Sequence, residues 1–195
     1  MAMAHTLVII SGPVASGKST VITALLKRHP DWAEGQSFTT RQPRPNEVVR
    51  NKYIFVTKDE FRARVADHEI IEYEEYAGNL YGTSRTSLEQ ALTSATVVIL
   101  DAQTKGKETL QRLYPAAIDI YLYVTDAEIK QRLATDASRA GVDSKQQQLR
   151  LEQALAQNAG RFSYSHVVAN QAGQLPAVID AVEHIIVNQV AANRP

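Results

Sequence analysis

The sequence predicts an α/β fold built on a parallel core sheet, and three observations lead to that prediction. Four short apolar runs rich in β-branched residues are typical of strands that are buried on both faces. Helical patterns separate these runs, and such alternation indicates a parallel sheet with right-handed crossovers. A glycine-bearing turn, "SGPVASGKST", joins the first run to the first helix. The predicted strands are Thr6–Ser11, Ala95–Asp101, Ala117–Val124 and Ser165–Asn170.

Three helical patterns lie between or after these strands. Lys18–His29 places its apolar residues on one face, and Leu175–Val190 is amphipathic with Pro176 near its first turn. Thr125–Ala134 opens with the spacing of a capping box, in which two orphan backbone donors are satisfied.

Two stretches interrupt the alternation, and we interpret both as insertions into a single domain spanning residues 1–195. Residues 37–85 combine alternating, tyrosine-rich segments with a short helix, which predicts a small mixed or antiparallel sheet. Residues 129–164 are polar, helical and dotted with arginines, as expected of a helical lid. The core is then expected at about 1–36, 86–128 and 165–195.

Composition and charge restrict the partners of the chain. With 195 residues, 44% of them apolar and 22% charged, it has the composition of a soluble globular domain. A net charge of zero disfavours a nucleic-acid polymer as partner, and the absence of cysteine excludes thiolate metal sites and a cysteine nucleophile. The N-terminal residues show no signal-peptide or membrane-span pattern, so we expect a cytoplasmic protein without a membrane partner. Monomer and homodimer both stay open.

The turn after the first strand fits the phosphate-binding pattern G-x-x-x-x-G-K-[ST] at every fixed position. Its glycines let consecutive N–H groups point inward, and the following helix adds the positive end of its dipole. Lys18 would reach the β- and γ-phosphates, and the Ser19 hydroxyl would ligate Mg²⁺. An incidental glycine turn is the alternative, which the strand–loop–helix context disfavours. The predicted ATP-binding residues here are Gly12, Pro13, Val14, Ala15, Ser16, Gly17, Lys18, Ser19 and Thr20.

Asp101 ends a predicted core strand, which places its carboxylate on the ligand side of such a sheet. It suits a second contact to Mg²⁺, although a helix cap or turn residue is an alternative.

The first insertion offers cations for a phosphorylated acceptor. Arg41 and Arg44 lie in the proline-stiffened segment "TTRQPRP", and arginine forks match phosphate oxygens in a bidentate way. Tyr53 and Tyr81 could add neutral donors. A phosphate acceptor, being anionic already, requires such cations rather than a general base. Solvated surface arginines are the alternative interpretation.

At this point the residues indicate a family. The segments "SFTTRQPRP", "NKYIFVTKDEF", "EYAGNLYGTS", "VILDAQTKG" and "YSHVVAN" closely resemble guanylate kinases, and the resemblance runs from about residue 5 to residue 190. It implies a three-layer P-loop kinase fold with a nucleotide-binding insertion and a helical lid. It also implies Mg²⁺-dependent phosphoryl transfer from ATP to GMP, giving ADP and GDP.

The resemblance also implies roles for individual residues. Arg41, Arg44, Tyr53 and Tyr81 match the residues that hold the GMP phosphate, and Ser37, Glu72 and Thr83 match those around guanine. Lys18 with the lid arginines Arg132, Arg139 and Arg150 matches the catalytic set, and Asn170 falls near the adenine of ATP. Glu72 makes chemical sense, because a carboxylate accepts the adjacent N1–H and N2–H of guanine but is left unpaired by adenine.

The chain departs from the family in one place that bears on specificity. Where family members usually read "LDIDxQG", this chain reads "LDAQTKG", so Gln103 replaces a second acidic residue near guanine. Glutamine accepts one hydrogen bond but brings no charge. A kinase acting on other or more nucleoside monophosphates, or on another phosphorylated metabolite, is therefore the second hypothesis. A non-catalytic binding module is the third, which the intact Lys18, Ser19 and Asp101 disfavour.

Overall fold

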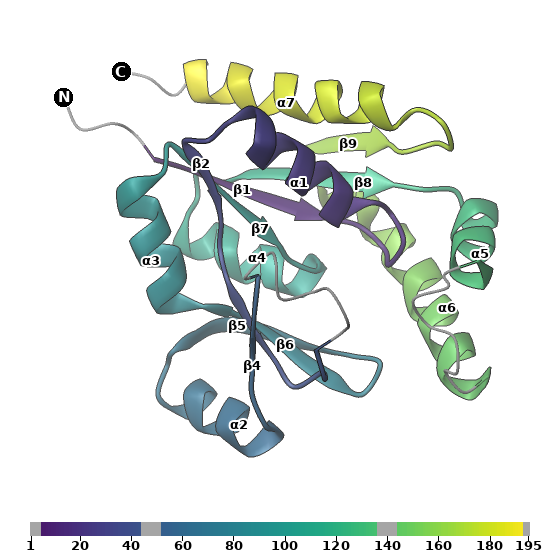
Figure 1. Cartoon of the computed structure of the whole chain (residues 1–195), viewed down its shortest axis with the longest axis horizontal. Helices are drawn as coiled ribbons and strands as arrows, with labels where there is room; N and C mark the ends of the chain where they lie inside the picture. The colour runs from purple at the N-terminus through teal and green to yellow at the C-terminus, as the bar shows by residue number, and fades with distance from the viewer. Residues whose placement is uncertain (1–4, 44–51, 136–143, 193–195) are drawn as a thin grey trace.

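The computed structural model of the chain describes residues 5–43, 52–135 and 144–192. Within them, a parallel core sheet has the strand order β2-β7-β1-β8-β9, with every neighbouring pair parallel (Figure 1). The strands are β1 (Thr6–Ser11), β2 (Trp32–Glu34), β7 (Val97–Asp101), β8 (Ile118–Tyr123) and β9 (His166–Ala169). The predicted α/β fold with a parallel core is confirmed.

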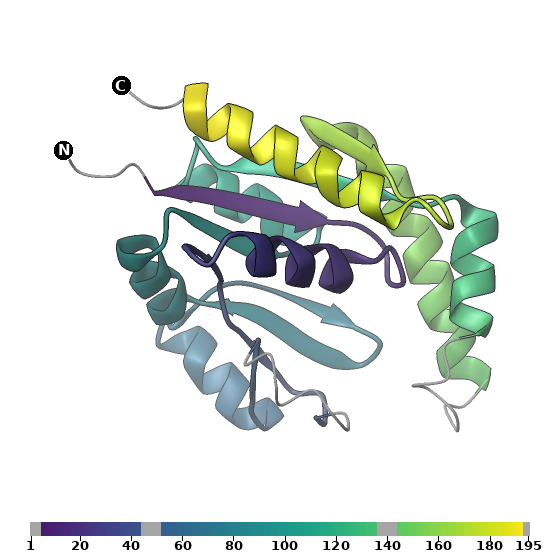
Figure 2. The ribbon, with the colours of Figure 1, turned by 45° about the horizontal axis from the view of Figure 1, so that its top comes forward.

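Helices cover both faces of this sheet, which gives three layers (Figure 2). The helices are α1 (Lys18–Arg28), α3 (Arg85–Ser94), α4 (Thr104–Leu113) and α7 (Leu175–Ala192). Because side chains alternate along a strand, Val8 and Ile10 of β1 pack with α1 and α7 on one face. Leu7 and Ile9 pack with α3 and α4 on the other. Both faces of β1 are therefore dry, as its continuous apolar run predicts.

Helix α7, with 18 residues, is long and apolar enough to cross a membrane by length and composition alone. One face of the helix carries Val178, Ile179, Val182 and Ile186, which are buried against the core sheet and α1. In this fold α7 therefore acts as the covering helix of the core.

A second, mixed sheet forms below the core, with the order β4-β3-β6-β5. Its elements are β3 (Ser37–Thr39), β4 (Tyr53–Phe55), α2 (Lys58–Ala66), β5 (Ile70–Tyr76) and β6 (Asn79–Ser84). Strands β3 and β4 run parallel, and the other pairs are antiparallel. Thr57 and Glu60 form a capping box that starts α2, and Phe61 of that helix packs with Phe38 and Ile70.

Two further helices, α5 (Asp126–Ala134) and α6 (Ser144–Ala159), stand beside the β1–α1 loop at one end of the molecule (Figure 2). They pack on each other through Ile129 and Ala154. A 3₁₀ turn, η3 (Gly160–Ser163), returns the chain to β9.

The structure adds elements that the sequence pattern does not reveal. Strand β2 has only three residues, too few to show a period, and it pairs with β7 at the edge of the core sheet. Helices α3 and α4 also lie in stretches for which the sequence pattern predicts no separate helix. Three predicted strands are shorter in the structure. The strand predicted at Ala95–Asp101 begins two residues later, and those predicted at Ala117–Val124 and Ser165–Asn170 each lose one residue at either end.

Candidate active site

The loop between β1 and α1 is built around Gly17, which has a left-handed φ of +89° and serves as the N-cap of α1. A Cβ at this position would lie 2.5 Å from Nδ2 of Asn170, so the close approach also requires glycine. Gly17 has no side chain to cap the helix, and the N-terminus of α1 with the positive end of its dipole favours an anion at this loop.

Lys18 is buried within this loop. Its Nζ donates to the carbonyl oxygens of Gly12 and Pro13, at 2.7 and 3.1 Å, and lies 3.9 Å from Oδ1 of Asp101. Burial lowers the pKa of Lys18, Asp101 opposes that shift, and the nearby Lys52 adds to it. The ammonium group is therefore desolvated and held at the position where phosphate oxygens would arrive.

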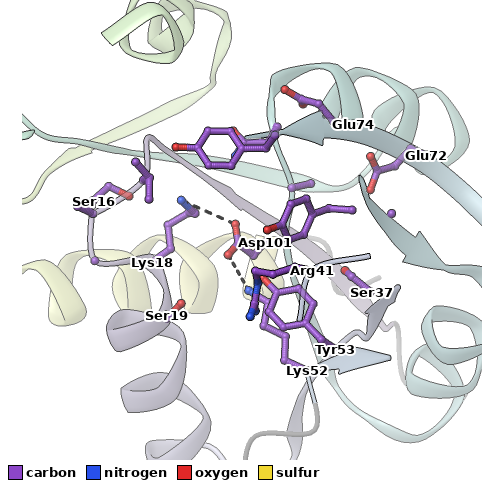
Figure 3. Close-up of a pocket in the computed structure, with 18 of the residues that line it drawn as sticks. Ser16, Lys18, Ser19, Ser37, Arg41, Lys52, Tyr53, Glu72, Glu74 and Asp101 are labelled. Carbon is purple, nitrogen blue, oxygen red and sulfur yellow. Dashed lines mark hydrogen bonds and ion pairs between the residues drawn. The ribbon is translucent and has the colours of Figure 1, made fainter. Parts of the chain in front are cut away.

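Asp101 lies between two lysines (Figure 3). Lys52 donates to its Oδ2 at 2.7 Å and approaches Oε1 of Glu34 at 3.7 Å. Burial alone would lower the pKa of Lys52, but Asp101, Tyr53 and Glu34 outweigh it and raise that pKa. Lys52 thus stays charged and joins the second sheet to the core. Sequence reasoning missed it, although a cation directly before Tyr53 was a usable signal.

The oxygen atoms near the phosphate loop are suitable ligands for a magnesium ion bound together with a nucleotide. Ser19 and Asp101 both line the pocket, and both offer the oxygen ligands that Mg²⁺ prefers. In the described ranges no group of three or more His, Cys, Asp or Glu side chains gathers to hold a metal. Mg²⁺ at nucleotide sites needs only one or two protein ligands, because phosphates and water supply the rest.

The other end of the pocket is formed by the second sheet. The Arg41 guanidinium lies over the Tyr53 ring, with its Cζ 5.3 Å from the ring centroid, and Tyr81 meets Tyr53 edge to face at 6.1 Å. Burial raises the pKa of Tyr53, with Lys52 opposing it. These groups place one cation and two phenols beside Lys52 and Asp101.

Glu72 marks the far side of this acceptor end. Its Oε1 accepts a 2.5 Å hydrogen bond from the Thr83 hydroxyl, and Thr83 is paired with Ser37 in the register of β6 and β3. Burial raises the pKa of Glu72, the bonds from Thr83 oppose the shift, and Glu74 adds to it. The three side chains expected around guanine therefore lie together.

Gly106 in the first turn of α4 makes room for the Glu72 carboxylate, because an added Cβ would overlap that group, with Cδ only 2.8 Å away. We predict that Gly106→Ala raises the KM for the acceptor about tenfold by displacing this carboxylate, the loss of one charged contact. Stability should not fall, since alanine is favoured over glycine in helices by about 1 kcal/mol. Steady-state kinetics and thermal unfolding, with the exposed Glu108→Ala on the same helix as control, check this. An unchanged KM would contradict it.

The pocket that unites these residues has a volume of about 510 Å³. Most of the predicted site residues line it: Val14, Ala15, Ser16, Gly17, Lys18, Ser19, Thr20, Ser37, Arg41, Tyr53, Glu72, Tyr81, Asp101 and Gln103. Gln103 is the N-cap residue of α4, but its side chain makes no capping hydrogen bond. The phosphate loop and the acceptor residues, which are distant in sequence, thus share one cavity.

Arg132 and Asn170 brace the phosphate loop from behind. Arg132 donates to the carbonyl oxygens of Ala15 and Asn170, at 3.1 and 2.8 Å, and pairs with Glu128 at 3.0 Å. The Asn170 amide donates to the Ser16 carbonyl at 2.7 Å and is buried. Neither residue lines the pocket, nor does Arg150 on α6. Arg44 and Arg139 lie outside the described residues.

The phosphate loop opens into a pocket that it shares with the second sheet, at the carboxyl edge of the parallel core sheet. This arrangement is that of the P-loop nucleotide kinases, the class to which this fold belongs. The family model of guanylate kinase matches residues 4–189. A guanylate kinase of Synechococcus sp. is 33% identical over 180 residues, covering 92% of this chain and 96% of that protein. One of Shewanella violacea is 38% identical over 167 residues, covering 84% and 79%.

Among solved structures, a guanylate kinase from Anaplasma phagocytophilum superposes with a TM-score of 0.73 at 23% identity, covering 97% of this chain and 87% of that one. This likeness supports the fold. The family model and the curated relatives together show that the chain belongs to the guanylate kinase family.

Proposed function

We propose that this protein transfers the γ-phosphoryl group of ATP to GMP, producing ADP and GDP, in the cytoplasm. The observation that carries the proposal is the single pocket that holds the phosphate loop at one end and Ser37, Arg41 and Glu72 at the other. A donor and an acceptor nucleotide bound at these two ends would bring their phosphates together between Lys18, Lys52 and Asp101.

The residues between the two ends suit phosphoryl transfer, which depends on positioning and charge neutralisation. Lys18 would hold the β- and γ-phosphates, and Arg41 with Tyr53 and Tyr81 would hold the acceptor phosphate. Mg²⁺ bound near Ser19 and Asp101 would neutralise charge on the ATP phosphates. No general base is required, because the acceptor phosphate is largely ionised at neutral pH.

We further propose that residues 37–85 act as the acceptor-binding insertion and residues 129–164 as a lid within one domain. Arg132, already attached to the loop through Ala15, is within the lid that would exclude water on closure. We propose that Arg139 and Arg150 also belong to the catalytic set. Asn170 would lie near the adenine of ATP. We expect the protein to act on free nucleotides, as a monomer or homodimer.

A steady-state assay of ADP release tests the proposal, using ATP and Mg²⁺ with GMP, dGMP, IMP, AMP, CMP and UMP as acceptors. We expect GMP to give the highest kcat/KM. Preference for another nucleotide would favour the alternative that Gln103 motivates, a kinase with a different or broader acceptor range. No turnover with any of them would favour another phosphorylated metabolite or a non-catalytic binding module.

A further inference from the structure

The acceptor end of the pocket contains a second carboxylate, Glu74, which the sequence motifs do not single out. Glu72 and Glu74 alternate along β5 with Tyr73 and Glu75. Both Glu72 and Glu74 line the pocket (Figure 3). Tyr73 and Glu75 are exposed. The side chain of Glu74 is therefore placed on the same wall of the cavity as Glu72.

One oxygen of Glu74 lacks a partner. Its Oε2 is buried and accepts no hydrogen bond from any residue that the structure describes. Burial raises the pKa of Glu74, and the Lys105 ammonium in the first turn of α4 opposes that shift. A buried acceptor without a donor is costly, and that cost is recovered when a ligand supplies an N–H or O–H group.

Gln103, the N-cap residue of α4, lines the same pocket with an uncharged side chain. Although Gln103 is uncharged, the pocket holds two carboxylates from β5, Glu72 and Glu74, in addition to Asp101. Negative charge is therefore available to an acceptor base without an acidic residue at position 103.

We propose that Glu74 is a specificity-determining residue that accepts a hydrogen bond from the exocyclic amino group of the acceptor base. The proposal rests on the function proposed above and names the group that distinguishes GMP from its 2-deamino analogue. Guanine presents N1–H and two N2–H donors. Glu72 can accept N1–H and one N2–H, which leaves the outer N2–H for the Glu74 carboxylate once its side chain turns the unpartnered oxygen toward the ligand.

The test compares Glu74→Ala with Glu75→Ala, which removes the same charge from the exposed face of the same strand. With ATP and Mg²⁺, kcat/KM is measured for GMP and for IMP, which lacks the amino group. We expect Glu74→Ala to lower kcat/KM for GMP about tenfold, the usual cost of one charged hydrogen bond, and to leave IMP unchanged. Glu75→Ala should change neither value, and an unaltered KM for ATP will show that both variants are folded.

Gln103→Asp added to Glu74→Ala returns a carboxylate to the pocket and is expected to restore the preference for GMP over IMP. If Glu74→Ala lowers GMP and IMP equally, or behaves as Glu75→Ala does, the role of Glu74 is overturned while the kinase function stands. A wild-type protein that phosphorylates neither GMP nor IMP would instead overturn the proposed function itself.

Discussion

Replacing Lys18 with alanine is expected to reduce kcat for phosphoryl transfer on the order of 10³-fold, the scale seen when a preorganised transition-state contact is lost. The ammonium of Lys18 is desolvated in the loop and lies 3.9 Å from Asp101, in a pocket shared with the acceptor residues. Electrostatic stabilisation is stronger in such a desolvated site than in water. The rate of ADP release at saturating ATP and GMP measures the loss.

Lys27→Ala is the matched control, because Lys27 is an exposed lysine in the last turn of the same helix. It removes the same charge outside the pocket and should leave kcat unchanged. Binding of GMP to the Lys18→Ala variant, measured by calorimetry without ATP, should persist and will show that the acceptor end is intact. A Lys18→Ala variant that keeps more than a tenth of the wild-type kcat would remove this lysine from the transition state.

The phosphate loop could be predicted from sequence because all of its determinants are local. A buried strand, Gly17 and the start of α1 are consecutive in the chain, and the structure places them as the pattern predicts. The parallel core was predictable because continuous apolar runs alternate with helical patterns along the chain. Strand β2 was not, because three residues at the edge of a sheet carry no periodic signal and depend on pairing with β7.

Lys52 and Glu74 show what a sequence pattern does not contain. The role of Lys52 depends on its hydrogen bond to Asp101, which lies 49 residues further along the chain. Sequence alone does not reveal this contact, because an isolated lysine is most often exposed to solvent. Glu74 belongs to the acidic run "EYEEY", in which only the strand's alternation decides which carboxylates are buried. Both roles arise from the way the second sheet lies against the carboxyl end of β7.

The contacts of Arg132 and Asn170 also go beyond the predicted roles. The resemblance implies that Arg132 belongs to the catalytic lid set and that Asn170 lies near the adenine of ATP. The structure shows both bonded to the backbone of the phosphate loop, through Ala15 and Ser16. A residue that fixes the loop and a residue that contacts its ligand are not distinguished by sequence position. Their proposed contacts with ATP therefore remain predictions.

Glu72→Gln should lower kcat/KM for GMP about 100-fold, mostly through KM, because two charged hydrogen bonds to the base are weakened or lost. Glutamine keeps the shape of the side chain and the contact with Thr83, but its NH₂ group faces the donors of guanine. Steady-state kinetics with GMP, with Glu75→Gln on the exposed face as control, measure the effect. A loss confined to kcat would place Glu72 outside base recognition.

The raised pKa of Glu72 adds a pH signature to the same variant. As pH falls through this pKa, the carboxyl group of the free enzyme binds a proton and can no longer accept both guanine donors, so the KM for GMP should rise. Glu72→Gln should lack this rise, and titration of the GMP phosphate affects both proteins equally.

The stability of the wild-type fold should change in the opposite sense and increase as the pH falls through this pKa. Because the folded-state pKa lies above the unfolded one, burial of the ionised group destabilises the fold at neutral pH, where Glu72→Gln should keep or raise the Tm. A variant that lost GMP binding together with a lowered Tm would show that Glu72 serves the fold rather than the base.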